Sequence, residues 1–342
     1  MAKILILGAG SMGTAFSFPC SDNGHSVSIV GTHLENDFID QIKSSKKHPA
    51  LNCEISKNVT FCKFEELQDE INKKIDLVVV AVISKGIEWA SVELSKVIKN
   101  NVPILILTKG LSINDNNYEV LAHKMERLLK KNGIKETNIS AAGGPCLAKE
   151  LANKANTSVV FANKDINAAE QISKLVSTDY YHVYTSNDVI GVETCAAIKN
   201  IFSMAVGASQ GLCASTKSKE ENYLNTAAAL IQESIYEMII FVEKLKGKKE
   251  TVIGLAGIGD LYVSADGGRN SKMGEYLGQG MKFKEAKKTK MPNTTVEGAD
   301  LALEIGTKVK KDFDIKTLPL MISMINTICE EKPLKVDWKN FK

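Results

Sequence analysis

The C-terminal half of this 342-residue sequence places a lysine in a setting suited to proton transfer. Residues 188–210, DVIGVETCAAIKNIFSMAVGASQ, form a helical pattern with small and apolar side chains all round, interrupted by Glu193, Lys199 and Asn200. Such a pattern predicts burial on most sides. A buried Lys199 would be desolvated and able to exchange a proton, whereas a snorkelling Lys199 would carry its ammonium into water. The helix by itself leaves both interpretations open.

A second stretch, residues 254–280, favours the interpretation in which Lys199 exchanges a proton. Its sequence is GLAGIGDLYVSADGGRNSKMGEYLGQG, and Arg269 is one of only two arginines among the 43 basic residues of the chain. A guanidinium offers a planar fork to a phosphate, whereas a lysine acts as a point charge. Asn270 and Ser271 occupy the expected N-cap of the helix that follows, where free amides favour an anion. We therefore predict a phosphate site at Arg269.

A glycine-rich loop near the N-terminus predicts dinucleotide binding. Gly8, Gly10 and Gly13 form a G-x-G-x-x-G motif directly after an apolar run and at the start of a helical pattern. The first glycine permits a tight turn, the second lets backbone approach a pyrophosphate, and the third brings helix and strand together. The pyrophosphate then lies at the N-terminus of the helix, whose free amides and dipole favour anions.

The sequence predicts the glycine loop clearly, but it predicts the choice between NAD and NADP less clearly. A site for NAD usually has Asp or Glu at the end of the second strand, where the carboxylate accepts from the ribose 2′-hydroxyl. Here that tip is Gly31-Thr32-His33, and the nearest acid, Glu35, is expected in the next helix. NADP is therefore permitted, although no arginine is available to clamp its 2′-phosphate. We expect NAD or NADP, with dual use or a preference for NADP.

The order of elements predicts an α/β fold: an N-terminal Rossmann-like doubly wound sheet followed by an all-helical C-terminal domain. The expected strands are 3–7, 26–30, 77–83, 104–108, 138–142, 158–162 and 182–185. After about residue 187 only helical patterns follow, over 188–210, 220–246, 271–280, 283–288, 296–305 and 318–331. We assign residues 1–187 to a dinucleotide-binding domain and 188–342 to a helical substrate-binding and catalytic domain. The active site is expected in the cleft between them.

Composition excludes several other classes of function. The net charge of +3 comes without a basic block, so nucleic acid is not an expected partner. No apolar run approaches the ~20 residues that span a membrane, and the N-terminus does not resemble a signal peptide, so we expect a cytoplasmic protein with no membrane span. The seven cysteines contain no C-x-x-C pair and the five histidines no H-E-x-x-H motif. Reduced thiols and no metal site are therefore expected.

Taken together, these motifs resemble the NAD(P)-dependent sn-glycerol-3-phosphate dehydrogenases from Gly8 to about Gly298. The shared segments, in order, are the glycine loop, TKGL (Lys109-Gly110), GGPCLAKE (Gly143–Glu150), AIKN (Lys199-Asn200), GLAGIGDL (Asp260), GGRN (Arg269-Asn270) and VEG (Glu297-Gly298). The resemblance implies reversible hydride transfer between NAD(P)H and dihydroxyacetone phosphate, giving sn-glycerol 3-phosphate for glycerophospholipid synthesis. It also implies a homodimer.

The resemblance assigns roles residue by residue. It implies that Lys199 is the general acid/base, that Asp260 holds its ammonium, and that Lys109 touches both cofactor and substrate. The implied substrate-binding residues are Lys109, Gly144, Cys146, Asn200, Ser264, Gly268, Arg269 and Asn270. The implied cofactor-binding residues are Gly8, Gly10, Ser11, Met12, Gly13, His33, Lys109, Ala148, Arg269 and Glu297.

The sequence departs from the family pattern at several of these positions. Met12 stands where the family usually has Trp or Tyr, and Cys146 stands where it has Ser, which leaves only a weak donor. Ser264 keeps the hydroxyl of the usual Thr, while Gly268 offers backbone only. Two alternatives to this reaction remain: a related dehydrogenase for an unphosphorylated hydroxyacid or hydroxyacyl substrate, and a catalytically silent dinucleotide sensor.

Overall fold

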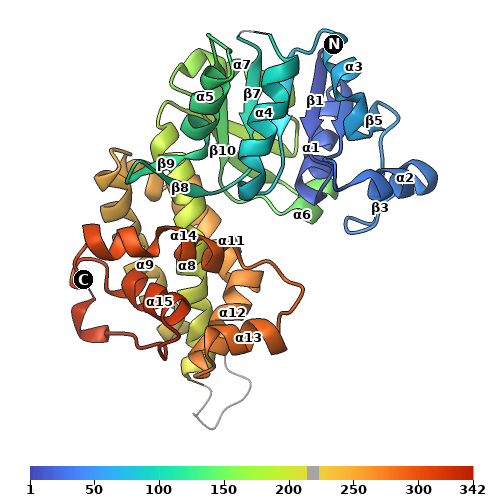
Figure 1. The fold of residues 1–342 in the computed structure, drawn as a ribbon. Coiled ribbons are helices and arrows are strands. Elements are labelled where there is room, and N and C mark those ends of the chain that lie inside the picture. The colour runs from blue at the N-terminus through green and yellow to red at the C-terminus, as the bar shows by residue number, and fades with distance from the viewer. Residues whose placement is uncertain (100, 214–222, 342) are drawn as a thin grey trace. The chain divides into compact units, whose positions relative to one another are not determined.

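The structure, a computed structural model, describes residues 1–99, 101–213 and 223–341. The chain forms two compact units (Figure 1). The first consists of Met1–Lys109 and Val120–Val189, and the second of Gly110–Glu119 and Ile190–Lys342. The second unit therefore takes in residues 110–119, which the predicted division had assigned to the N-terminal domain.

An eight-stranded sheet forms the centre of the first unit. Its strands are β1 (Lys3–Leu7), β2 (Ser26–Val30), β5 (Val59–Cys62), β6 (Leu77–Val80), β7 (Pro103–Ile106), β10 (Asn138–Gly143), β11 (Thr157–Ala162) and β12 (Tyr181–Ser186). They lie in the order β12-β11-β10-β7-β6-β1-β2-β5, and β10–β11 is the antiparallel pair. The side chains of Ile4, Leu5, Ile6 and Leu7 are fully buried, as expected for a strand covered on both faces.

The helices of this unit are α1 (Ser11–Asp22), α2 (Asn36–Ser45), α3 (Leu67–Asn72), α4 (Ile87–Val97), α5 (Leu121–Lys131), α6 (Ala148–Ala152) and α7 (Ile166–Val176). Along the chain, the step from β1 to β2 goes toward one edge of the sheet, and the later step from β6 to β7 goes toward the other edge. Right-handed crossovers in two directions place helices on both faces of the sheet. The helices α4 and α5 pack side by side (Figure 1), and α1 packs against α6.

The predicted strands all occur in this sheet, with ends that differ by a few residues. The prediction missed the edge strand β5, because its four residues carry too short a pattern to stand out. It also missed the antiparallel direction of β11, since the periodicity of apolar residues is the same in both directions. A small two-stranded ladder, β3 (Lys47–His48) with β4 (Cys53–Glu54), completes the first unit.

The second unit is mainly helical. Its helices are α8 (Val189–Leu212), α9 (Leu224–Lys244), α10 (Lys249–Val252), α11 (Asp260–Ala265), α12 (Arg269–Gly278), α13 (Phe283–Thr289), α14 (Glu297–Asp312) and α15 (Pro319–Cys329). A π-helical turn over Leu255–Gly259 precedes α11. Residues 220–222 of the predicted helix over 220–246 lie outside the described residues. Among the described residues that follow the predicted helical patterns no strand occurs, and the strands that join this unit lie within residues 111–120.

Those strands form a hairpin, β8 (Leu111–Asn114) with β9 (Asn117–Val120), that packs on α14. Asp115 and Asn116 between the two strands both have positive φ, 47° and 59°. A two-residue turn with both residues at positive φ suits the twist of a hairpin, and Asp and Asn tolerate this conformation better than most residues. The sequence Asn-Asp-Asn-Asn therefore contained a hairpin signal that the prediction did not use.

The 24-residue helix α8 is long and apolar enough to cross a membrane by length and composition. However, 94% of its most apolar window is buried inside the protein. It carries the buried polar residues Lys199 and Asn200. These features make α8 the core helix of the second unit, around which the other helices pack.

Glycines bring α12 against α8 at very short range. A Cβ atom added to Gly274 of α12 would lie 1.8 Å from the carbonyl oxygen of Met204, and one added to Gly207 of α8 would lie 2.2 Å from that of Ser271. Gly211 and Gly278, one turn further along each helix, are equally confined. Because both obstacles are backbone atoms, neither helix can yield without moving as a whole. This contact fixes α12 on α8.

We predict that Gly274→Ala destabilises the protein strongly. The added methyl group has to push the two helices apart, which costs about 1–3 kcal/mol or more of unfolding free energy. Chemical denaturation followed by circular dichroism measures the loss. Gly254→Ala is the matched control, because its Cβ would meet its nearest atom, the Glu250 carbonyl oxygen, at 3.3 Å. Equal stability of the two variants would contradict the close helix contact.

A buried carboxylate joins α9 to α15. Glu237 of α9 is fully buried and accepts from the backbone amides of Leu320 (2.5 Å) and Met321 (2.8 Å) in the first turn of α15. These amides have no partner within their own helix, so the side chain serves as their cap. Burial raises the pKa of Glu237 to about 8, the charge of Glu233 acts in the same direction, and the two amide hydrogen bonds oppose them.

We predict a pH-dependent stability that depends on Glu237. Its pKa is raised in the folded state above the ordinary 4.5, so its contribution is complete below about pH 4.5 and is lost as the pH rises through about 8. The unfolding free energy of the wild type, relative to Glu237→Gln, should therefore fall across this window. Denaturation of both proteins in a pH series measures the difference. A difference independent of pH would show that Glu237 is not protonated in the folded state.

Candidate functional site

The glycine loop of the first unit has the geometry that a pyrophosphate requires. Gly8 has φ +110°, and a Cβ there would lie 2.8 Å from the Ala81 carbonyl oxygen. A Cβ on Gly13 would lie 2.3 Å from the carbonyl oxygen of Gly8, so only glycine lets α1 come this close to β1. Gly10, the N-cap of α1, has open space where its Cβ would point. The loop therefore leaves its backbone accessible beside free helix amides.

The predicted cofactor residues Ser11 and Met12 begin α1 directly after this loop and are half-buried. Both belong to the first turn, where the backbone N–H groups have no partner inside the helix. No side chain caps the helix start at Gly10. These positions are therefore available to a dinucleotide through their backbone as well as through their side chains.

A carboxylate lies at the tip of β2, contrary to the expectation for this site. Glu35 is the N-cap of α2 and turns its side chain back, so that one oxygen, Oε2, accepts from the amides of Thr32 (2.7 Å) and Ala9 (3.3 Å). Ala9 belongs to the glycine loop. The preference for NADP was predicted because the tip of the second strand carries no acidic residue. That premise is wrong, because Glu35, which lies beyond the strand end, supplies a carboxylate there.

Three partly exposed rings gather beside the same edge of the sheet. The centroid of the His33 ring lies 5.2 Å from that of Trp89, and that of Phe64 also lies 5.2 Å from Trp89. His33, which was predicted to bind the cofactor, follows β2; Phe64 follows β5, and Trp89 lies in α4 after β6. The carboxyl ends of parallel strands form the ligand-binding edge in such folds. Phe64 and Trp89 were missed because their three strand ends meet only in the folded sheet.

The other predicted residues of the first unit also follow strands at this edge. Lys109 comes after β7 and donates from Nζ to the carbonyl oxygen of Gly144 (3.2 Å), which follows β10 and has φ +105°. Cys146 and Ala148 continue the same segment into α6, and both are half-buried. The structure thus brings Lys109 directly to the GGPCLAKE segment, 35 residues away in the sequence.

In the second unit Lys199 is paired rather than snorkelling. Its side chain is 7% exposed, and Nζ donates to Oδ1 of Asp260 at 2.7 Å and also to the hydroxyl of Ser264. Asp260 begins α11 and is itself 3% exposed. Burial disfavours the ammonium and the neighbouring carboxylate favours it. The Lys199 side chain is therefore held in position, out of bulk water.

Arg269 lies at the start of α12, two residues earlier than the predicted helix start. Gly268 is the N-cap, which corrects the expectation that Asn270 and Ser271 cap this helix. The amides of Arg269, Asn270 and Ser271 are therefore first-turn donors that the helix does not use. The guanidinium donates to the carboxylate of Glu297 at the start of α14, and both side chains are substantially exposed, 58% and 40%.

Asn200, next to Lys199 on α8, lies in a buried network with Asn270. Asn270 donates from Nδ2 to Oδ1 of Asn200 (3.0 Å) and accepts on Oδ1 from the amide of Gly298 (2.9 Å). The three residues come from α8, α12 and α14. This network had no signal in the sequence beyond the presence of the two asparagines.

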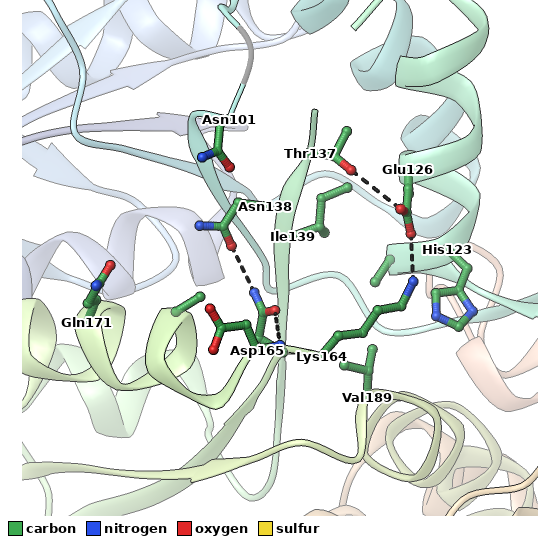
Figure 2. A pocket seen from close by; sticks show the side chains of 13 residues that line it. Asn101, His123, Glu126, Thr137, Asn138, Ile139, Lys164, Asp165, Gln171 and Val189 are labelled. Atoms are coloured by element: carbon green, nitrogen blue, oxygen red, sulfur yellow. Dashed lines mark hydrogen bonds and ion pairs between the residues drawn. The ribbon is translucent and has the colours of Figure 1, made fainter. Parts of the chain in front are cut away.

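A polar depression elsewhere on the first unit does not belong to this site. It has a volume of about 420 Å³ and is lined by side chains that include Asn138 and Asn163 (Figure 2). Asn138 begins β10, so the depression lies at the opposite edge of the sheet from the glycine loop. Asn163 on its floor donates to Asn138 and Ser140 and accepts from the amide of Asp165, and Glu126 pairs with Lys130 and Lys164. These groups are satisfied without a ligand.

Within residues 1–99, 101–213 and 223–341, no three His, Cys, Asp or Glu side chains gather into a possible metal site. One unit carries a dinucleotide loop with a carboxylate at the tip of its second strand. The other carries a buried lysine–carboxylate pair and a helix start with an arginine. A loop with the geometry of a dinucleotide site, together with a buried lysine–carboxylate pair, is typical of an NAD(P)-linked oxidoreductase.

Comparison with known proteins identifies the family within this class of oxidoreductases. The family profile for the N-terminus of NAD-dependent glycerol-3-phosphate dehydrogenase matches residues 3–169, and that for the C-terminus matches residues 188–337. The NADP(+)-dependent glycerol-3-phosphate dehydrogenase of Archaeoglobus fulgidus is 31% identical over 314 residues, which cover 90% of this chain and 91% of that protein. The NAD(P)+ enzyme of Agathobacter rectalis is 30% identical over 340 residues, with coverages of 98% and 94%.

Solved structures agree with the sequence comparison. Glycerol-3-phosphate dehydrogenase from Coxiella burnetii superposes with a TM-score of 0.81 at 25% identity, covering 97% of this chain and 96% of that one. The Plasmodium falciparum enzyme gives 0.84 at 20% identity, covering 99% and 95%. A D-mandelate dehydrogenase reaches only 0.57 at 16% identity, which indicates shared fold alone.

The chain belongs to the NAD-dependent glycerol-3-phosphate dehydrogenase family. It is an NAD(P)-dependent oxidoreductase that interconverts dihydroxyacetone phosphate and sn-glycerol 3-phosphate by reversible hydride transfer. Its cofactor is NAD or NADP. The family assignment favours this reaction over the two alternatives left open by the sequence.

We predict that Glu35 discriminates against the 2′-phosphate of NADP(H). Both loop hydrogen bonds go to one oxygen of Glu35, so the amide oxygen in Glu35→Gln can keep them while the charge is lost. The ratio of kcat/KM for NADPH to that for NADH should then rise roughly fivefold, the factor for ~1 kcal/mol of relieved repulsion.

Steady-state kinetics with both cofactors on the wild type and two variants test this prediction. Glu35→Ala is the matched comparison, because it removes the hydrogen bonds as well as the charge and should weaken both cofactors. An unchanged ratio in Glu35→Gln would mean that the carboxylate only shapes the loop.

Proposed function

We propose that Lys199 is the general acid/base of the reaction. In the reducing direction the ketone oxygen gains negative charge as C2 receives a hydride, and a nearby ammonium stabilises that oxygen and donates a proton to it. In the oxidising direction the neutral amine takes the proton back from the hydroxyl. The observation that carries this proposal is the burial of Lys199 in direct contact with Asp260.

Asp260 and Ser264 hold the Lys199 side chain in one orientation by accepting from its Nζ. Nζ has three N–H donors, and Asp260 and Ser264 accept two of them. A lysine held by two partners loses little further entropy when the substrate binds, which favours the transition state over a loosely held cation.

The phosphate of the substrate binds at the start of α12. The amides of the first turn, the backbone of Gly268 and the guanidinium of Arg269 together suit a dianion. Glu297, the partner of Arg269, is exposed enough for an incoming anion to compete for the guanidinium. Phosphate binding at a fixed distance from Lys199 then aligns the carbonyl for hydride transfer.

The cofactor supplies the hydride from its nicotinamide when bound. On this chain, Gly8, Gly10, Ser11, Met12 and Gly13 bind its pyrophosphate through their backbone, and His33 lies against its adenosine half. Ala148, Arg269 and Glu297 are further cofactor contacts, and Lys109 contacts both cofactor and substrate. Gly144 and Cys146 line the substrate side, where the thiol provides a weaker donor than serine.

We further propose that the enzyme is a cytoplasmic homodimer that supplies sn-glycerol 3-phosphate for phospholipid synthesis. The similar proteins are glycerol-3-phosphate dehydrogenases, which supports sn-glycerol 3-phosphate as the product. Supply of this product for phospholipid synthesis follows from the reaction. Light scattering of the purified protein tests the dimer. Loss of glycerophospholipid labelling on depletion of the enzyme tests the physiological role.

We predict that Lys199→Arg and Lys199→Ala both lower kcat by roughly 10²–10⁴. Arginine keeps the positive charge and the partner of Asp260, but it does not release its proton in the useful range. NAD(P)H oxidation with dihydroxyacetone phosphate measures kcat, and fluorescence titration with NAD(P)H shows that cofactor binding is retained.

The arginine variant separates chemistry from folding. Lys199→Ala leaves the buried Asp260 without its cation and is expected to lower stability by about 3–5 kcal/mol, whereas Lys199→Arg should be close to wild type in its melting temperature. Full turnover by Lys199→Arg would show that a fixed positive charge suffices and would remove Lys199 as the proton donor.

A further inference from the structure

His48, at the end of β3, is a buried histidine next to the glycine loop. The residue is 1% exposed, and the ring of Phe38 from α2 packs edge-on against it, with 5.1 Å between the two centroids. The backbone of Ala9 lies beside the His48 ring, and the charge of Glu35 acts on it. Ala9 belongs to the glycine loop, and its amide donates to Glu35. A titratable ring therefore lies under the part of the first unit that is proposed to hold the cofactor.

The two ring nitrogens of His48 face different groups. Nδ1 accepts from the amides of Ala50 (3.2 Å) and Leu51 (3.3 Å) in the turn between β3 and β4. Because an amide can only donate, Nδ1 carries no proton, and the neutral ring carries its proton on Nε2. Burial lowers the pKa of His48 below its ordinary 6.5, although the Ala9 backbone and the charge of Glu35 oppose this shift. The neutral ring with an Nε2–H donor therefore predominates at neutral pH.

This Nε2–H donor faces the Ala9 carbonyl without forming a complete hydrogen bond. A backbone group that favours the protonated ring has to be an acceptor, so the group of Ala9 beside the ring is its carbonyl oxygen. Since the turn amides occupy Nδ1, this oxygen lies on the Nε2 side. Nε2 is nevertheless a buried atom to which the described residues offer no hydrogen bond of good geometry. A buried donor in this state carries a desolvation penalty that nothing offsets.

The Ala9 carbonyl belongs to the same peptide unit as the Gly10 amide. In a trans peptide the C=O and N–H bonds point in opposite directions, so a carbonyl held against His48 directs the Gly10 amide away from the ring. Thr14 donates from its hydroxyl to this carbonyl (3.1 Å), and a carbonyl oxygen can accept two hydrogen bonds. Gly8 and Gly10 flank Ala9, and their backbone freedom allows this peptide unit to rotate.

We propose that His48 is a positioning residue for the cofactor: its Nε2–H donates to the Ala9 carbonyl when the pyrophosphate binds, and this bond aims the Gly10 amide at the pyrophosphate. The proposal rests on the proposed assignment of the glycine loop to the pyrophosphate. The hydrogen bond is completed only in the bound state, so it adds to the affinity for NAD and NADP alike. His48 differs in this respect from Glu35, whose charge is predicted to discriminate between the two.

Two amide substitutions separate the roles of the two ring nitrogens. His48→Asn places an oxygen near the position of Nδ1, where it can accept from the turn amides, but it offers no donor at the position of Nε2. His48→Gln places an NH₂ donor near the position of Nε2 and leaves the turn without its acceptor. We expect His48→Asn to raise the Kd for NADH and for NADPH roughly fivefold, as for one lost hydrogen bond, and His48→Gln to stay within about twofold of the wild type.

Fluorescence titration of the full-length variants with NADH and NADPH measures these dissociation constants. NADH oxidation with dihydroxyacetone phosphate adds a second readout, because a residue that acts on the loop should change the KM for NADH and leave kcat and the KM for dihydroxyacetone phosphate almost unchanged. His182→Asn is the matched control, since His182 is exposed on β12, the edge strand at the far end of the sheet. It should bind NADH as the wild type does.

The order of the two variants decides the inference. If His48 acted only through Nδ1 as part of the turn, His48→Gln would be the weaker binder, and that result overturns the proposal. Wild-type affinity in His48→Asn, or a loss of kcat as large as the loss of affinity, also overturns it. Should His48→Gln not fold by circular dichroism, the comparison of His48→Asn with His182→Asn decides by these same two criteria.

Gly10→Ala tests the assignment on which the inference rests. Its Cβ has open space in the protein, so the variant should fold and the methyl group should meet the bound pyrophosphate. Unchanged NADH affinity in Gly10→Ala overturns the assignment of the loop, and the inference falls with it. Weak binding by Gly10→Ala together with wild-type affinity in His48→Asn overturns the inference alone.

Discussion

The close contact of α8 with α12 and α14 is the constraint on which the catalytic unit depends. Three helices that are far apart in the sequence approach until backbone meets backbone, and this is possible only where glycine removes the side chain, at Gly207, Gly274 and Gly298. Each helix carries one of the predicted site residues: Lys199 lies on α8, Arg269 on α12 and its carboxylate partner Glu297 on α14.

The unit handles buried charge in two different ways. Lys199 lies buried against Asp260, and removing either partner would leave the other buried without its ion-pair partner. Glu237 accepts from two backbone amides, and burial raises its pKa to about 8. The first arrangement holds the Lys199 side chain in a fixed position, whereas the second joins α9 to α15.

The first unit is organised differently, because its predicted cofactor-binding residues lie together at one edge of the sheet. Each element of the site follows the carboxyl end of a strand: the glycine loop follows β1, His33 follows β2, and Lys109 follows β7. Parallel strands bring these ends to one edge regardless of their separation in the sequence. Glu35 shows the limit of that rule, because it lies beyond the strand end and reaches the loop by turning back from the start of α2.

The sequence by itself determined the class of fold and the glycine loop, and it singled out the residues proposed to react. These follow from local patterns: a three-glycine turn, apolar strands that alternate with helices, and a rare arginine beside glycines. It also determined that Lys199 lies on a helix buried on most sides. The strands near residues 3–7 and 26–30 were predicted to the residue, because short, strongly apolar runs bounded by glycines or turns are decided locally.

The tertiary structure decided everything that depends on contacts between distant segments. The Asp260 partner of Lys199, the carboxylate of Glu35 at the loop, the ring cluster with Trp89 and the direction of the asparagine network each join residues from different elements. The start of α12 at Arg269, rather than at Ser271, also moved the N-cap from Asn270 to Gly268. Hydrogen-bond direction and side-chain burial are properties of packed neighbours, and a linear pattern names the residues without saying which atoms they turn toward one another.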